Sequence, residues 1–232
     1  MNPCHGLWWD GNVLYGVCRG PREPTDHWPH ELGRPAPTDY QAAIFRAEDT
    51  NGDDVADTWE RVAPIMAGMF DHGPHRIMRA PDNTVNIIMG NNTFAPETNT
   101  DMEEIMSRVK ERDFIPEYKD QWGMTRAQGS FWRFDIPTRR YEPLITGMRN
   151  AVGYTFNLLG EMFYFDSDME PEIGTPWYRP VRSAHGVPNA DFGFRYGSNK
   201  FPADYFDTLP AMRNDGRGSP TGVQSHQAWA YP

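Results

Sequence analysis

Apolar positions in this chain come in short runs that are separated by turn-forming residues. In the first unit, residues 6–18, aromatic and β-branched residues flank Asp10-Gly11-Asn12, a turn that is typical of β-hairpins. The same strand–turn–strand pattern returns over residues 75–90 and 153–166. Further strands are predicted at residues 42–47, 131–135 and 140–144. The pattern therefore predicts antiparallel hairpins along most of the chain.

These hairpins recur at intervals of roughly 70 residues with insertions between them, which is typical of the blades of a β-propeller. We therefore predict an all-β fold with long loops, in which residues 1–232 form a single partial propeller domain. After Asp166 the chain reads mostly as loop and ends without a closing strand. Because an open propeller exposes sheet edges, we expect it to be part of a larger protein. One segment, residues 101–111, has helical spacing and predicts a short inserted helix.

Composition and charge narrow the possible functions. The chain has 32 acidic and 22 basic residues, a formal net charge of −10, which argues against nucleic-acid binding. No run approaches the roughly 20 apolar residues of a membrane span, and the N-terminus lacks the features of a signal peptide. Two cysteines, Cys4 and Cys18, are compatible with one disulfide in an oxidising compartment or with two buried thiols.

Residues 49–60 match the calcium loop motif D-x-[DN]-x-[DN]-G-x5-E, with one departure, Asp54 where glycine is expected. Ca²⁺ binds about six to eight oxygens from a loop that curls around it. Aspartate tolerates the left-handed conformation needed at the glycine position, so a structural calcium site is favoured over a solvated acidic turn. The predicted ligands are Asp49, Asn51, Asp53, the Val55 carbonyl, Asp57 and Glu60.

A second group of candidate residues follows the ends of the predicted strands. His72 precedes one hairpin and Asn91 follows it, so both should emerge at the same end of a blade. A histidine can accept an alcohol proton near neutral pH, although a hydrogen-bonded loop residue is the alternative. Arg149 could hold an anionic ligand in a bidentate contact or form a surface ion pair. The acidic loop 166–172 offers oxygens to a cation or caps a turn.

In this order, His72, Asn91 and Arg149-Asn150 resemble the pattern of the pyrroloquinoline quinone (PQQ) dependent glucose/sorbosone dehydrogenase propellers. More closely, the chain is similar to the propeller module of planctomycete-type membrane-bound dehydrogenases. The resemblance runs from about Gly6 to Val223. It is carried by residues 49–57, 72–75, 90–93, 147–150, 166–170, 174–180 and 218–223.

The resemblance implies a six-bladed β-propeller, of which this chain holds about three to four blades, with the site on the axis. It implies that His72 takes the hydroxyl proton while hydride passes to PQQ, and that Arg149 stabilises charge on the quinone oxygen. The aspartate that raises the basicity of the histidine falls on Asn91, whose amide orients an imidazole without stabilising its positive charge. Calcium bound near the cofactor is also implied. The implied cofactor-binding residues are Arg149, Asn150, Asp168 and Met169.

The resulting hypothesis is an oxidoreductase that oxidises a sugar or other alcohol with PQQ. The resemblance implies an exported protein of the periplasm or cell envelope, with a c-type haem electron acceptor in the same or a neighbouring chain. The alternative is a non-catalytic, calcium-stabilised propeller that binds glycans or a protein partner. Asn91 favours this alternative, whereas His72 and Arg149 favour the enzyme. A complete, open half-propeller is disfavoured by its unpaired edges.

Overall fold

The computed structural model describes residues 4–20, 41–66, 72–91, 93, 129–195, 204–206 and 208–226. These residues form thirteen β-strands in three sheets and one short 3-10 helix, η3 (Glu170–Glu172). The prediction of an all-β fold is confirmed. The helix predicted at residues 101–111 lies outside the described residues. Within the described part of the chain, no helix is long and apolar enough to cross a membrane.

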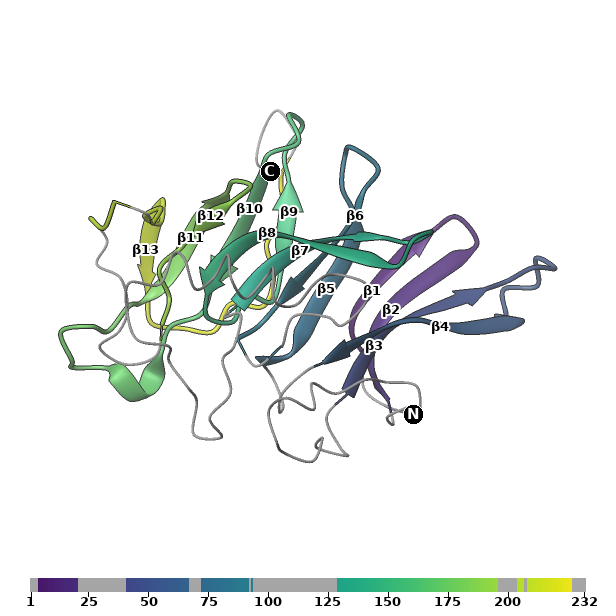
Figure 1. The fold of residues 1–232 in the computed structure, drawn as a ribbon, viewed down its shortest axis with the longest axis horizontal. Coiled ribbons are helices and arrows are strands. Elements are labelled where there is room, and N and C mark those ends of the chain that lie inside the picture. Colours follow the sequence, from purple (N-terminus) through teal and green to yellow (C-terminus); the bar gives the residue numbers. More distant parts are fainter. Residues whose placement is uncertain are drawn as a thin grey trace.

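The first sheet is an antiparallel meander of four strands in the order β1-β2-β3-β4 (Figure 1). The predicted hairpin at residues 6–18 and the strand at 42–47 are confirmed, but β4 was not predicted. Its Pro64 is compatible with a strand because β4 lies at the edge of the sheet, where a missing backbone donor is tolerated. The strands are β1 (Cys4–Asp10), β2 (Val13–Gly20), β3 (Gln41–Glu48) and β4 (Thr58–Met66).

The second sheet repeats this meander and adds one short parallel strand, in the order β12-β8-β7-β6-β5. Its two hairpins are those predicted at residues 75–90 and at 131–135 with 140–144. Pro143 lies within β8, beside an irregularity in the pairing with β7. The strands are β5 (Pro74–Arg79), β6 (Val85–Met89), β7 (Gly129–Asp135), β8 (Arg140–Met148) and β12 (Ala190–Asp191).

The third sheet has the order β13-β11-β10-β9 and contains the predicted hairpin at residues 153–166. After Asp166 the described part of the chain is mostly loop, as predicted, but it also contains three strands that were not predicted, β11, β12 and β13. Two of them, β11 and β13, complete this sheet. Neither strand has an apolar pattern that would reveal it: β11 carries Arg182 and His185, and all four residues of β13 are exposed. The strands are β9 (Tyr154–Phe156), β10 (Met162–Asp166), β11 (Val181–Gly186) and β13 (Arg213–Gly216).

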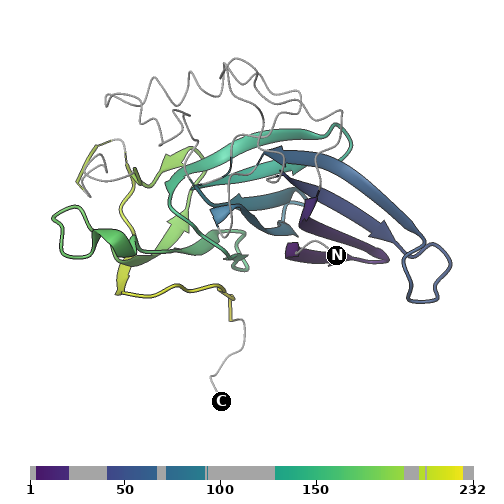
Figure 2. The same cartoon turned by 90° about the horizontal axis from the view of Figure 1, so that it is seen from below.

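Two apolar clusters join the sheets face to face, with the second sheet in the middle (Figure 2). One cluster combines residues of the first two sheets, such as Ile44 and Ile87, and the other combines residues of the last two, such as Ile88 and Tyr164. Ile87 and Ile88, which are successive residues of β6, thus contribute to opposite clusters, and all five residues of the strand are buried. This arrangement of consecutive meanders is that of propeller blades.

The first strands of the first two sheets approach each other at backbone distance. A Cβ atom built on Gly6 of β1 would lie 2.1 Å from the carbonyl oxygen of His75 in β5, so no larger residue fits without movement. Similarly, residues 221–226 lie beside β9, where the backbone N–H of Ser225 donates to Thr155 Oγ1 at 3.2 Å. The first strand of each sheet therefore has a backbone neighbour beyond its own sheet.

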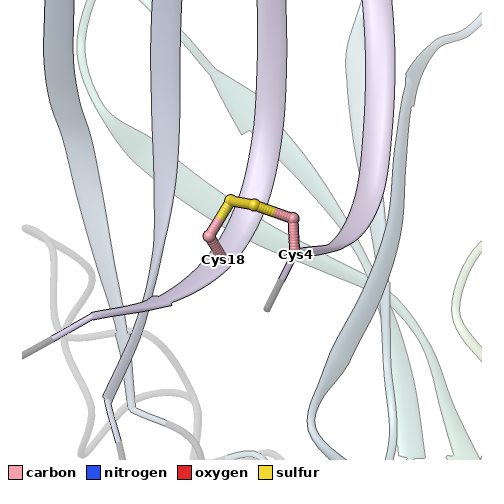
Figure 3. The surroundings of a disulfide bond; sticks show 2 residues. All are labelled: Cys4 and Cys18. Atoms are coloured by element: carbon pink, nitrogen blue, oxygen red, sulfur yellow. A yellow bond between two sulfur atoms is a disulfide. The ribbon is translucent and has the colours of Figure 1, made fainter. Parts of the chain in front are cut away.

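A disulfide joins Cys4 and Cys18, which are paired in register across β1 and β2 (Figure 3). The two Cα atoms are 3.9 Å apart. Of the two possibilities that the sequence left open, the structure has the disulfide. It fixes the end of the first hairpin that carries the start of β1.

Candidate functional site

His72 and Asn91 meet at one end of the β5–β6 hairpin. The backbone N–H of Gly90 donates to the Gly73 carbonyl at 2.8 Å, which closes that end of the hairpin. His72 Nδ1 then lies 2.7 Å from Oδ1 of Asn91, whose side chain is buried. An amide oxygen only accepts hydrogen bonds, so Nδ1 of His72 donates, and Nε2 is the nitrogen that can take a proton. The prediction that both residues emerge together is confirmed.

Arg149 and Asn150 join this pair from the end of β8. The backbone N–H of Asn91 donates to the Arg149 carbonyl at 2.8 Å. A Cβ atom on Gly90 would lie 2.2 Å from Asn150 Oδ1 and 2.5 Å from the His72 carbonyl oxygen, so this crossing point requires glycine. The structure thus brings together the four residues that the sequence proposed for the axis.

Asn150 also holds a second histidine that was not predicted. Its Oδ1 lies 2.7 Å from Nε2 of His75, which is buried, and the His75 ring packs edge-on to His5 at 5.9 Å between centroids. As for His72, the amide oxygen can only accept, so Nε2 of His75 carries the proton of this hydrogen bond. The sequence signal that could have indicated His75 as a site residue is its position three residues after His72, across Gly-Pro.

Asp166, at the end of β10, anchors the backbone of this site. Its carboxylate is buried and accepts the backbone N–H groups of Arg149 at 3.0 Å and Asn150 at 2.9 Å. Its Oδ2 also accepts from Arg182 Nη2 at 2.7 Å in a buried ion pair. Asp166 therefore fixes the backbone of both site residues from the neighbouring sheet, which is a contact that sequence spacing does not reveal.

The Arg149 guanidinium is buried and contacts the acidic loop. Its Nη1 donates to Ser167 Oγ at 2.7 Å and its Nη2 pairs with Glu170 Oε2 at 3.0 Å. Its Nε is buried without a hydrogen-bond partner among the described residues. The predicted role of Arg149 toward an anionic ligand stays a prediction, and Glu170 is the anion that it contacts here.

Asp168 and Met169 lie in the same loop. The hydroxyl of Tyr178 donates to Asp168 Oδ2 at 2.7 Å, while Oδ1 is buried without a donor among the described residues. Desolvation and this hydrogen bond raise the pKa of Tyr178, so the phenol stays protonated near neutral pH. The Met169 carbonyl accepts from Glu172 N at 2.9 Å and shapes the η3 turn.

The predicted calcium loop lies at the end of the first sheet that is opposite to the disulfide. There Asp49 N donates to the Asn12 carbonyl of the β1–β2 turn at 3.2 Å. Asp54 has a φ of 63°, so it does adopt the left-handed conformation. The Asp49 carboxylate accepts several backbone N–H groups of the loop, chiefly that of Gly52 at 2.6 Å, and these lower its pKa.

Four of the other predicted calcium ligands, the side chains of Asn51, Asp53, Asp57 and Glu60, also have partners within the protein. Asn51 Oδ1 accepts from Asp53 N at 2.9 Å, Asp53 Oδ1 accepts from Val55 N at 2.9 Å, and Asp57 Oδ2 accepts from Thr50 N at 2.8 Å. Glu60 pairs with Arg139 at 2.5 Å. Within the described ranges, no group of three histidine, cysteine or acidic residues is placed to hold a metal ion. Calcium binding by this loop stays a prediction.

Comparison with solved structures identifies the architecture. No protein-family profile and no curated protein matches the sequence. The PQQ-bound aldose sugar dehydrogenase of Streptomyces coelicolor superposes with a TM-score of 0.54 and 12% identity, over 91% of this chain and 52% of that one. A glucose dehydrogenase-type oxidoreductase of Thermus thermophilus superposes with a TM-score of 0.59 and 15% identity, over 94% and 59% of the two chains. The fold is that of the PQQ glucose dehydrogenase β-propellers.

The chain spans between 52% and 59% of the length of these structural relatives. At such low identity the likeness shows the fold alone. The planctomycete-type subtype, the haem partner and the export of the protein stay predictions.

Proposed function

We propose that this propeller is a quinoprotein-like oxidoreductase that oxidises a sugar or other alcohol, with His72 as the base. The observation that carries the proposal is the hydrogen bond of 2.7 Å from His72 Nδ1 to Asn91. It leaves Nε2 as the basic nitrogen. The backbone N–H of Asn91 donates to the Arg149 carbonyl, and a PQQ-bound sugar dehydrogenase shares the fold.

The residues around Arg149 suit an anionic quinone and a cation. Arg149 Nε and Asp168 Oδ1 are buried polar atoms without hydrogen-bond partners among the described residues, and such atoms are costly unless a ligand satisfies them. Arg149 and Asn150 would hold the quinone, and Asp168 and Met169 a calcium ion. When bound, PQQ supplies the hydride acceptor.

The chain's own residues would then act on the proton. Asn91 holds the His72 ring in one tautomer, and Nε2 takes the hydroxyl proton of the substrate as the alcohol is oxidised. In this contact the resulting imidazolium faces an amide dipole and gains no countercharge. We therefore expect slow turnover compared with a site that has a carboxylate there.

The rival proposal is a non-catalytic propeller that binds glycans or a protein partner. Two observations favour it: the amide at Asn91, and the ion pair of 3.0 Å that already occupies Arg149 with Glu170. It differs from the enzyme in predicting carbohydrate or protein binding without any dependence on PQQ.

The test is a titration of the purified protein with PQQ in the presence of Ca²⁺, followed by tryptophan fluorescence and by dye-linked oxidation of aldoses. His72→Gln should abolish oxidation and leave binding in place, whereas Arg149→Met should weaken binding. The control is His185→Gln, because His185 is a partly exposed residue that stacks on Phe163 on β10. A folded protein that neither binds PQQ nor oxidises any aldose would overturn the proposal.

A further inference from the structure

A cavity of about 600 Å³ lies beside the ion pair of Asp166 and Arg182. It is formed by the loop that precedes β11 and by the segment that leads into β13. Its volume falls within the range that is typical of small-molecule sites. The lining residues are 176–180, Arg182 and 208–214.

Arg179 lines this cavity, and no described carboxylate forms an ion pair with its guanidinium, although Asp166 and Asp191 lie close enough to raise its pKa. Its Nη1 donates to the Phe192 carbonyl at 3.1 Å, and Arg182 Nη1 donates to the same oxygen at 3.1 Å. Two guanidinium groups therefore share one acceptor. Arg182 has Asp166 as its partner, whereas no acidic side chain in the described part of the chain lies within ion-pair distance of Arg179.

The neighbouring buried carboxylates already form ion pairs with other arginines. Asp191 pairs with Arg195 at 2.9 Å, as Asp166 pairs with Arg182 at 2.7 Å. Burial, and then the charge of Arg182, lower the pKa of Arg179 to about 10. An anion would offset both effects. The cation at the cavity wall thus gains more from an incoming anion than a solvated arginine does.

The rest of the wall combines exposed apolar side chains with polar residues, among them Thr208, Arg213 and Asn214. Trp177 is 38% exposed, Leu209 41% and Met212 64%, although each is a large apolar residue. Prolines at positions 176, 180 and 210 also line the cavity. Apolar surface with a few polar groups is the usual composition of a small-molecule site.

We propose that this cavity binds a small organic anion, with its oxyanion on Arg179 and its planar or apolar body against Trp177 and Leu209. A guanidinium binds a carboxylate or a phosphate through two parallel hydrogen bonds, which suits either oxyanion. None of the residues proposed to act on the substrate or to hold the quinone lines this cavity, although Tyr178 and Arg182 in its wall contact Asp168 and Asp166 of that site.

The experiment is isothermal titration of the protein with indole-3-acetate, and with indole-3-acetamide as the neutral match. The acetate should bind about tenfold or more tightly than the amide, and Arg179→Gln should remove that difference. Arg139→Gln is the control, because Arg139 lies outside this cavity, is 52% exposed and already pairs with Glu60. Its affinity should change less than about twofold.

Two further measurements keep the test decisive. Arg179→Lys keeps the positive charge but lacks the planar guanidinium, so it should bind the acetate more weakly than the wild type. This variant replaces Arg179→Gln in the test if Arg179→Gln does not fold. Inorganic phosphate should compete with the acetate if the oxyanion is what Arg179 holds. Equal binding of acetate and amide, or no binding of either, would overturn the proposal.

Discussion

His72 donates through Nδ1 to the side-chain oxygen of Asn91 at 2.7 Å, and the two residues meet because they flank a single hairpin. The contact fixes which nitrogen of the imidazole is basic. It does so with an amide, which orients the ring but gives no charge to a protonated histidine. His72 is therefore oriented as a general base, and its basicity depends on the residue at position 91.

Asn91→Asp should strengthen that base. A carboxylate at this distance favours the imidazolium, so it raises the pKa of His72 and moves the acidic limb of the pH–activity profile to higher pH. We expect turnover above that limb to rise about tenfold. The measurement is kcat/KM for aldose oxidation against pH, with PQQ and Ca²⁺ present. Asn83→Asp, in an exposed turn, is the charge control. An unchanged profile in a folded Asn91→Asp variant would contradict a role for this contact.

Asp166→Asn should destabilise the protein strongly. The substitution leaves Arg182 buried without its countercharge, and breaking a buried ion pair of this kind costs about 3–5 kcal/mol of unfolding free energy. Urea denaturation measures the loss. Glu142→Gln, which removes an exposed partner of Arg133 at 2.9 Å, should cost less than about 1 kcal/mol. Equal losses of unfolding free energy in the two variants would mean that the buried ion pair stabilises the protein no more than the exposed one.

Reduction of the disulfide should lower the unfolding free energy by about 2–4 kcal/mol, because the bond closes a short loop in the unfolded chain. The bridged residues are 14 positions apart. Urea curves with and without a phosphine reductant measure the change. The Cys4→Ser/Cys18→Ser protein should already have the lower value and should not respond to reductant; a further loss there would point to a general effect of the reagent.

Calcium should raise the melting temperature if the loop at residues 49–60 binds it. Asp49→Asn should reduce that rise, whereas Asp54→Asn removes the same charge at a position not predicted as a ligand and should not. The lowered pKa of Asp49 also predicts how the stability of the protein depends on pH when calcium is absent. Its contribution to stability is present above the pKa of the unfolded state and is lost as pH falls through the lower folded value. A melting temperature that is indifferent to calcium in the wild type would rule out the site.

The hairpins could be predicted because alternating apolar runs and turn residues are local signals. The strands that escaped prediction lack such signals for definite reasons. β11 looks polar because Arg182 pairs with a buried carboxylate from β10, and β13 has no buried residue at all. β4 follows an acidic loop and contains a proline, which its position at a sheet edge permits.

The candidate site shows the same division. His72, Asn91, Arg149 and Asn150 could be proposed from their order at strand ends. The contacts of Asp166 and Glu170 with them could not, because they depend on how neighbouring sheets pack. The cavity at Arg179 is a similar case, since its unbalanced charge appears only when the partners of all neighbouring arginines are known.

The middle sheet has a consequence for how this protein can change. Every residue of β6 is buried, and Ile87 and Ile88 belong to opposite apolar clusters, so the strand has no exposed side on which substitutions are free. Yet β6 ends directly before Gly90 and Asn91, which shape the site. A library meant to alter the chemistry should therefore leave β6 intact and spend its diversity on the loops, where variation does not disturb two interfaces at once.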